Sequence, residues 1–268
     1  MTTLAILQAR VQSSRFPDKI LAPFCGQPMI LFQLARLTQT SGLDVVVACP
    51  DDEDNKPLIR LLAQHGYDCC PWSGPQDDVL GRFYYVAEQY RPDIIIRITA
   101  DCPLMDSTML TDMQNAYRLY GAPPDLLGIA AEWGDGFDAE IFTYDALEQA
   151  HLQATLASDR EHVTPWIWTK KEVYDIQSYP CPLDMSWLRL SVDTPIDLHL
   201  IERIARNCLR RFGWHFTWHD IWAVITGHPS WRQNMQARQH NAAYVTQIAN
   251  ERGERPMSWQ QLRYGSGK

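Results

Sequence analysis

Short apolar runs alternate along this chain with amphipathic stretches of helical length, and this alternation is what most constrains its fold. Strands are expected at residues 4–8, 44–48, 93–99, 125–130 and 188–192. Helices are expected between them, at residues 28–39, 53–65, 77–89, 107–120 and 144–155. A chain of this kind forms a mostly parallel sheet, and we expect a three-layer α/β fold with helices on both faces.

Two parts of the chain depart from this alternation. Residues 134–142 are expected to form an extended insertion rather than another strand–helix–strand unit. After residue 211 the chain becomes helical and rich in tryptophan, so we expect an α/β domain at 1–211 and a helical appendage at 212–268, with a loose polar end at 263–268. Because Trp214, Trp218 and Trp222 recur every four residues, a buried helix face is a better interpretation than a surface for stacking sugars or bases.

Charge and composition exclude several classes of protein. A formal net charge of −8 argues against a general nucleic-acid binder, which would carry a basic face. No apolar run approaches the roughly 20 residues that span a bilayer, and the Met-Thr-Thr start lacks the features of a secretory signal. We therefore expect a cytoplasmic protein without membrane partners. The seven cysteines include no C-x-x-C pair, so we expect reduced thiols.

The strongest local signal is a basic loop directly after the first expected strand. Arg10, Arg15 and Lys19 lie there with Ser13 and Ser14, all within ten residues. Ligands bind at the carboxyl ends of strands in open α/β sheets. Three cations at that position repel one another unless an anion neutralises them, and a triphosphate has the required charge and reach. Neither a Walker motif nor a dinucleotide motif is present, and a solvated basic loop is the structural alternative.

Two aspartates close later strands and are expected at the same edge of the sheet. Asp101 follows the apolar run Ile94–Ile98, and Asp193 follows residues 188–192. Mg²⁺ is commonly held by one or two carboxylates together with substrate phosphates. The alternative is helix capping, since Asp193 or Thr194 precedes Pro195.

These motifs together resemble the cytidylyltransferase superfamily. The resemblance rests on the loop A-R-x-x-S-S-R-x-P-x-K and the strand ends I-T-A-D-C-P-L and V-D-T-P, and it covers roughly residues 4–200. The superfamily includes synthetases of CMP-3-deoxy-manno-octulosonate and CMP-sialate. The most similar branch is that of spore coat polysaccharide biosynthesis protein F, which also resembles this chain at residues 77–84, 135–140 and 160–165, and more weakly at His228, Pro229, Trp231, Asn241 and Tyr244.

The resemblance implies an activity and a role for particular residues. It implies transfer of CMP from CTP to a sugar or sugar acid, with release of pyrophosphate, by a Mg²⁺-dependent homodimer. The implied nucleotide-binding residues are Ala9, Arg10, Ser14, Arg15, Lys19, Asp78 and Arg82, of which Arg10 and Lys19 act in catalysis together with Asp101. The implied metal ligands are Asp101 and Asp193, and the implied acceptor-binding residues are Asp135, Asp138, Glu140, Arg160 and His162.

Some features depart from the family pattern, and other functions compete with it. Asp18 and Ala100 stand where relatives usually have glycine, and the loop lacks the paired glycines usual in sialate synthetases. A nucleotide-sugar-dependent glycosyltransferase is one alternative, although such enzymes more often carry a D-x-D motif. A non-catalytic nucleotide-binding subunit is another. The pair His215 and His219 has metalloprotease spacing, but Phe216 replaces the glutamate that such a site requires.

Overall fold

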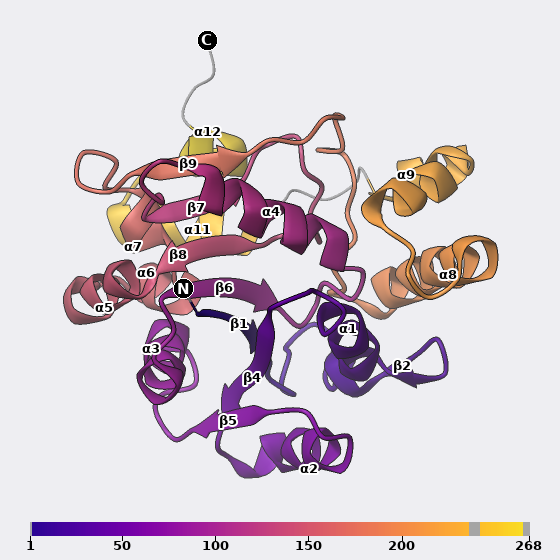
Figure 1. The fold of residues 1–268 in the computed structure, drawn as a ribbon, viewed down its shortest axis with the longest axis horizontal. Coiled ribbons are helices and arrows are strands. Elements are labelled where there is room, and N and C mark those ends of the chain that lie inside the picture. Colours follow the sequence, from indigo (N-terminus) through magenta and orange to yellow (C-terminus); the bar gives the residue numbers. More distant parts are fainter. Residues whose placement is uncertain (1, 236–241, 265–268) are drawn as a thin grey trace.

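A seven-stranded sheet forms the centre of the computed structural model, which describes residues 2–235 and 242–264 (Figure 1). In spatial order its strands are β5 (Cys69–Trp72), β4 (Asp44–Pro50), β1 (Thr3–Gln8), β6 (Ile94–Thr99), β8 (Glu140–Thr143), β7 (Leu126–Ile129) and β9 (Ile176–Tyr179). The strands from β5 to β6 are parallel, β8 runs antiparallel to β6 and β7, and β7 pairs in parallel with β9. The predicted mostly parallel sheet is confirmed.

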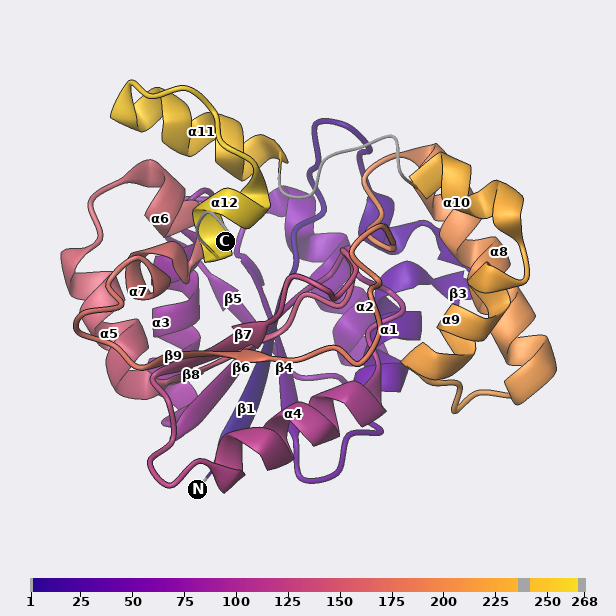
Figure 2. The same ribbon diagram turned by 90° about the horizontal axis from the view of Figure 1, so that it is seen from above.

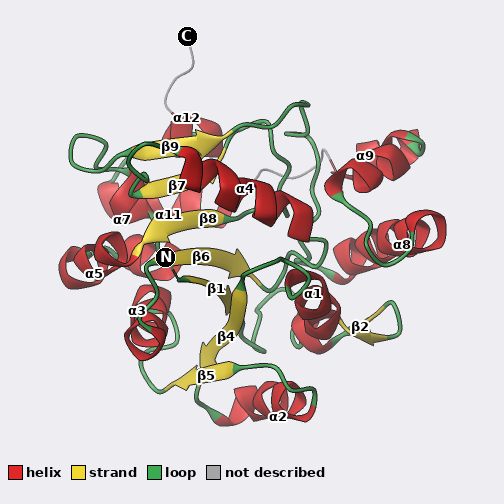
Figure 3. Ribbon diagram, viewed as in Figure 1, coloured by secondary structure: helices red, strands yellow, loops and turns green. Residues whose placement is uncertain are grey.

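Helices cover both faces of this sheet, so the predicted three-layer arrangement is also confirmed (Figure 3). One face packs against α1 (Met29–Leu37), α2 (Lys56–Gln64) and α4 (Ser107–Leu119). The other packs against α3 (Val79–Tyr90), α5 (Tyr144–Gln153) and α7 (Pro165–Trp168). The shorter elements are η1 (Lys19–Leu21), η2 (Glu53–Asn55), α6 (Ala157–His162) and the two-stranded ribbon of β2 (Pro23–Phe24) and β3 (Gln27–Pro28).

The central strands are apolar because both of their faces are buried. In β1, Ala5 and Leu7 enter the core beneath α1 and α4, whereas Leu4 and Ile6 enter the core beneath α3 and α5. Successive side chains of a strand point to opposite faces, so a strand covered on both sides is apolar at every position. This explains why the first and third expected strands were clear in the sequence.

Four of the five strands and the five helices predicted from the sequence are present, and the prediction for residues 188–192 is wrong. That segment is extended but makes a single isolated bridge, between Asp135 and Arg189. Both sides of β6 are already paired, with β1 and β8, so no edge of β6 is left for it. Pro28 pairs with Pro23 in the small ribbon, and α1 therefore begins one residue later, at Met29.

The helices after the sheet form two groups on opposite sides of the molecule (Figure 2). The first group is α8 (Pro195–Phe212), α9 (Trp218–Thr226) and α10 (Pro229–Met235), and it shares the core of α1 and α4. The second is α11 (Ala242–Arg252) and α12 (Trp259–Tyr264), which packs against α6 and α7. The boundary predicted after residue 211 coincides with the end of α8 and stays a prediction.

Two expectations about this tail need correction. Trp214, Trp218 and Trp222 all pack against the core, as expected, but Trp214 lies before α9, so the four-residue spacing does not mark a single helix face. Arg263 is not part of a loose end, because it belongs to α12 and its side chain is 6 % exposed. Asn241 and residues 265–268, which also figured in the sequence analysis, lie outside the described residues.

Candidate active site

A cleft of about 1170 Å³ opens at the carboxyl ends of β1 and β6, where the sequence predicted a site. Its walls come from the basic loop after β1, the segments around residues 135–140 and 189–193, and helices α6, α7, α11 and α12. The predicted site residues that line it are Ala9, Arg10, Ser14, Arg15, Lys19, Arg82, Asp101, Asp135, Asp138, Glu140, His162 and Asp193. Asp78 and Arg160 do not line it.

The basic loop is neutralised by carboxylates, contrary to the expectation that its cations would crowd one another. Arg10 Nη1 lies 3.3 Å from Asp77 Oδ1, and Arg15 Nη2 lies 2.8 Å from Asp193 Oδ1. The amide of Val11 donates to Asn55 Oδ1 at 2.9 Å, which ties the start of the loop to η2. The structure thus arranges cations and anions in pairs along one wall of the cleft.

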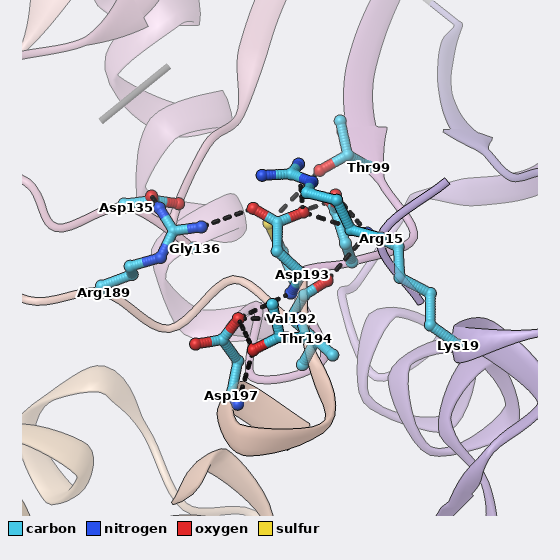
Figure 4. Close-up of polar contacts among 12 residues, drawn as sticks. Arg15, Lys19, Thr99, Asp135, Gly136, Arg189, Val192, Asp193, Thr194 and Asp197 are labelled. Carbon is cyan, nitrogen blue, oxygen red and sulfur yellow. Dashed lines mark hydrogen bonds and ion pairs between the residues drawn. The ribbon is translucent and has the colours of Figure 1, made fainter. Parts of the chain in front are cut away.

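Lys19 lies between the two aspartates that the sequence singled out, Asp101 and Asp193. Figure 4 shows Lys19 with Asp193, Val192 and Arg15. Lys19 Nζ is 3.1 Å from Asp101 Oδ2, 3.4 Å from Asp193 Oδ1 and 2.7 Å from the carbonyl oxygen of Val192. Burial by itself lowers the pKa of Lys19, but the charges of Asp101 and Asp193 outweigh it and raise the pKa above its ordinary value. Burial likewise raises the pKa of Asp101, and Lys19 outweighs that effect, so the carboxyl stays ionised.

Asp193 faces the cleft because its neighbour caps the helix instead. Thr194 and Asp197 form a capping box at the start of α8, and Asp197 Oδ2 also accepts from the amide of Asp193 at 3.1 Å. The carboxylate of Asp193 is then held by Arg15, Lys19 and Arg189. Capping, the structural alternative, therefore applies to Thr194 and leaves Asp193 for the site.

The two aspartates fit a divalent cation. A single ammonium group reaches oxygen atoms of both carboxylates, so these oxygens converge on one point beside the basic loop. Mg²⁺ takes oxygen ligands and is usually held by one or two carboxylates with phosphate and water completing its shell. Among the described residues, no group of three or more potential ligand side chains is found, so phosphate and water oxygens would supply the remaining positions.

The segment at residues 134–142 forms the opposite wall, and it is partly a strand. Asp135 pairs with Arg189, and the amide of Gly136 donates to Asp138 Oδ2 at 2.8 Å. Glu140, the first residue of β8, is in contact with three donors: Arg97 Nη1 at 3.0 Å, Arg263 Nη2 at 2.7 Å and Thr164 Oγ1 at 2.7 Å. Burial raises the pKa of Glu140, but Arg263 and Arg97 outweigh it and lower the pKa, so this carboxylate is ionised and already fully hydrogen-bonded.

Asp78 and Arg160 form an ion pair with each other and do not line the cleft. Arg160 Nε and Nη2 lie 2.7 and 2.9 Å from the two carboxylate oxygens of Asp78, a bidentate pair. Asp78 also caps α3 by accepting from the amide of Gly81. These contacts give both residues a role in positioning α3 and α6, and the ligand contacts suggested for them stay predictions.

His162 lines the cleft as a neutral imidazole. Burial, helped by the charge of Arg97, lowers its pKa to about 4. Its ring lies against Tyr244 of α11, with 4.7 Å between the ring centroids. Cys102, next to Asp101, is a buried thiol whose pKa burial raises well above the ordinary value, so it is no thiolate at neutral pH.

The sequence analysis missed several residues of the cleft. Arg97 interrupts an otherwise apolar strand and Arg189 interrupts Leu188–Leu190 in the same way, a signal that could have identified both. Arg263 and Trp259 of the tail also line the cleft, and no local pattern marks them. Tyr244, which the family resemblance marked only weakly, lines the cleft as well. The histidine pair set aside earlier is engaged elsewhere: His215 Nδ1 lies 2.8 Å from Gln39 Oε1, and His219 stacks on Trp218. Within the described ranges, no helix combines the length and apolar character needed to cross a bilayer.

Comparison with known proteins shows the family of this chain. The family model for cytidylyltransferases matches residues 4–212. An uncharacterised protein of Methanocaldococcus jannaschii is 32 % identical over 77 % of this chain and 84 % of its own length. Spore coat polysaccharide biosynthesis protein SpsF of Bacillus subtilis is 28 % identical over 78 % of this chain and 88 % of its own length.

A solved structure agrees with this assignment. The structure of a cytidylyltransferase from Leptospira borgpetersenii is 30 % identical to this chain and aligns with a TM-score of 0.79, covering 90 % of this chain and all of that one. The chain therefore belongs to the cytidylyltransferase family and is a CTP-dependent nucleotidyltransferase.

Proposed function

We propose that this cytidylyltransferase transfers CMP from CTP to a sugar or sugar acid in the synthesis of a polysaccharide or glycoconjugate precursor. The observation that carries the proposal is the position of Lys19 between Asp101 and Asp193, beside Arg15, at the carboxyl edge of the sheet. This is an array of alternating charges into which a metal-bound triphosphate fits. The similarity to a spore coat polysaccharide biosynthesis protein supports the class of product.

In this proposal the basic loop binds the phosphates of CTP. Arg10, Ser14, Arg15 and Lys19 contact phosphate oxygens, while Ala9 brings the backbone close to them. Arg82 is 2 % exposed and lines the cleft, and its Nε has no hydrogen-bond partner in the described part of the chain. A buried N–H group without a partner is costly, so Arg82 supports a contact with a polar group of the nucleotide.

The reaction we propose is in-line attack of an acceptor hydroxyl oxygen on the α-phosphorus. A new O–P bond forms, the bond to pyrophosphate breaks, and the hydroxyl proton passes to solvent. Lys19 and Arg15 stabilise the negative charge that develops on the phosphate oxygens, which is the main task of enzymes that transfer such groups. Asp101 and Asp193 would hold Mg²⁺, which would add further positive charge at the phosphates.

Binding of CTP has to rearrange the charge pairs of the free protein. Lys19 and Arg15 now neutralise the two aspartates. Carboxylates that hold a metal ion would leave Lys19 and Arg15 available for the phosphates. We therefore expect metal and nucleotide to bind with positive coupling, because each makes the partners of the other available.

A thermal scan tests the nucleotide assignment. CTP with Mg²⁺ is expected to raise the melting temperature more than ATP, GTP or UTP, since a ligand stabilises according to its concentration relative to its dissociation constant. EDTA should remove most of the shift produced by CTP. Equal shifts with all four nucleotides would contradict a cytidine-selective site.

The acceptor is identified by measuring pyrophosphate release from CTP with a panel of compounds. The panel covers nonulosonic and other sugar acids, neutral sugars and phosphonates. Asp135, Asp138 and His162 are proposed to contact the acceptor directly, and Glu140 to act by holding Arg97 and Arg263 in place. Release that proceeds equally fast without any acceptor would mean hydrolysis and would contradict transfer.

Assembly and location belong to the same proposal. We predict a two-fold dimer to which the C-terminal helices and residues 134–142 contribute. It stays a prediction, and residues 134–142 are mostly buried within the chain. Light scattering at micromolar concentration decides between dimer and monomer. A cytoplasmic location is proposed because CTP is supplied there.

A further inference from the structure

The far end of the cleft is built by a part of the chain that lies beyond the family match. Helix α12 brings Arg263 to β8, where its Nη2 contacts Glu140 Oε1 at 2.7 Å. The guanidinium lies 5.0 Å from the centre of the Trp168 ring, and Gly128 of β7 leaves space for it. A Cβ added at Gly128 would come within 2.4 Å of Arg263 Nη2. Arg263 therefore occupies a fitted position in the wall of the cleft.

The charges at this end do not balance. Two guanidinium groups, of Arg97 and Arg263, share the single carboxylate of Glu140. His162, which lines the same part of the cleft, is neutral and adds no charge. Arg97 donates its Nε to the neutral amide oxygen of Gln8 at 3.1 Å. Among these described side chains one positive charge is left over, in a place where both arginine side chains are mostly buried, and such a charge favours an anion nearby.

Unused hydrogen-bonding groups at the same place also indicate a ligand. Arg263 is more than nine-tenths buried and lines the cleft, and its Nη1 has no partner among the described residues. The hydroxyl of Tyr244 is also buried without a hydrogen-bond partner in the described part of the chain. The rings of Tyr244, Trp168 and Trp259 meet edge to face, with centroids 5.7 to 6.1 Å apart, and form an apolar wall beside these groups.

We propose that Arg263, together with Arg97, binds an oxyanion of the acceptor, a carboxylate or a phosphate, so that the C-terminal helices determine acceptor specificity. The inference rests on the proposed transfer of CMP. The aromatic wall suits the apolar face of a sugar ring, and the two arginines suit a planar or tetrahedral oxyanion. The basic loop, with its cations Arg10, Arg15 and Lys19, lies at the other side of the cleft and remains available to bind CTP.

The test compares Arg263→Met, Arg263→Lys and Gly128→Ala with the full-length wild-type protein, and Arg206→Met, an exposed arginine of α8, is the matched control. Pyrophosphate release is measured with 3-deoxy-manno-octulosonate and N-acetylneuraminate as carboxylates, glucose 1-phosphate as a phosphate, and glucose as a neutral sugar. For the acceptor that is used, Arg263→Met should raise KM at least about tenfold while the KM for CTP changes less than about twofold. Arg263→Lys should raise the KM for the acceptor less than Arg263→Met does. Gly128→Ala should raise this KM as Arg263→Met does, because the added Cβ displaces the guanidinium.

The outcomes separate this inference from the proposed function. A neutral sugar as the preferred acceptor, an unchanged acceptor KM in Arg263→Met and Gly128→Ala, or an equal rise in the KM for CTP would overturn the role of Arg263 and leave CMP transfer intact. Should Arg263→Met not fold, Gly128→Ala decides. If no acceptor supports pyrophosphate release, the proposed function fails. The changes in melting temperature caused by the same acceptor compounds then decide whether Arg263 binds an oxyanion. A shift that the anionic probes produce in the wild type and not in Gly128→Ala supports it, and no shift with any anionic probe overturns it.

Discussion

Lys19 contacts carboxylates in the free protein, and in the proposed reaction it contacts phosphates. Without a ligand its ammonium group neutralises Asp101 and Asp193, and it is only 12 % exposed. In the proposed reaction the same group would stabilise the charge that develops on the phosphates. From the sequence alone, repulsion among the cations of the basic loop predicts that removing Lys19 has a small or favourable effect on stability. The structure reverses that expectation, because Lys19 is surrounded by carboxylates.

Lys19→Ala is expected to lower both activity and stability. Pyrophosphate release should fall at least about a hundredfold, the effect of removing one preorganised electrostatic group. The free protein should lose about 1–3 kcal/mol in free energy of unfolding, since two carboxylates lose a buried partner. Lys56→Ala, which removes the exposed lysine paired with Asp51, is the control and should change neither quantity much. Full activity in Lys19→Ala would remove this residue from the mechanism.

Asp193→Asn separates the charge of Asp193 from its shape. The amide keeps the size of the side chain, and Thr194 caps α8 in either case, so the fold should persist. Activity that depends on Mg²⁺ should fall about as far as in Lys19→Ala, because one of the two proposed carboxylate ligands loses its charge. The measurement is the rate of pyrophosphate release as a function of metal concentration. Unchanged dependence on Mg²⁺ would show that the metal is held elsewhere.

Single residues were predictable where an apolar strand ends in a charged or polar group. Asp101 was found in this way, and so were the cations of the first loop. Asp193 was found from the apolar run at 188–192, although that segment is extended without being a strand of the sheet. Arg263 could not be found, because its position in the cleft depends on a helix that returns to β8 from more than a hundred residues away. Asp78 and Arg160 were identified from family resemblance, but their bidentate pair is a tertiary contact that a motif does not reveal.

At the scale of elements, the crossing of two extended segments, at residues 135–136 and 188–190, holds one wall of the cleft. The amide of Asp135 donates to the carbonyl oxygen of Leu188 at 3.1 Å, and the amide of Leu190 donates to that of Asp135 at 2.7 Å. Gly136 lies directly on Leu190 with a φ of 105°, a value that favours glycine. The segment at 188–193 is thereby fixed at both ends, at Asp135 and near Asp101.

Gly136→Ala is expected to disrupt this crossing. The added Cβ would lie 2.7 Å from two atoms of Leu190, and the backbone angle is unfavourable for alanine, so we expect a loss of at least about 2 kcal/mol in free energy of unfolding. Urea denaturation measures it. Gly121→Ala is the matched control, because a Cβ there meets nothing within 4 Å, and its stability should change by less than about 0.5 kcal/mol. Equal stability of the two variants would refute the close packing at Leu190.

The elements that the sequence analysis found are those with a clear period or a continuous apolar run. It missed β5, which contains Pro71, and β9, whose residues Gln177 and Ser178 are polar because it is an edge strand. It read β8 as part of an insertion because Glu140 opens that strand with a charge. In each case the pairing partner, rather than the local sequence, decides that the segment is a strand.

At the scale of the whole molecule, α11 and α12 close one side of the cleft over a layer of charged and aromatic groups. His162 lies in this layer, facing Arg97, Glu140 and the ring of Tyr244. The protonation state of His162 therefore depends on whether α11 and α12 are packed against it. A histidine that is neutral when folded and protonated when unfolded couples the stability of the whole protein to pH.

The sign and the pH range of this coupling follow from the two pKa values. The folded pKa of His162 is about 4 and its ordinary value is 6.5, so between these values the unfolded chain binds a proton that the folded one does not. Stability should therefore fall as the pH decreases from about 6.5 to about 4, and between pH 7 and pH 5 His162 alone should account for about 2 kcal/mol. His162→Asn should lose less stability than the wild type over that range, as measured by urea denaturation at each pH. His65→Asn, which removes an exposed histidine, should follow the wild type. Parallel curves for His162→Asn and the wild type would mean that the tail leaves His162 open to water in solution.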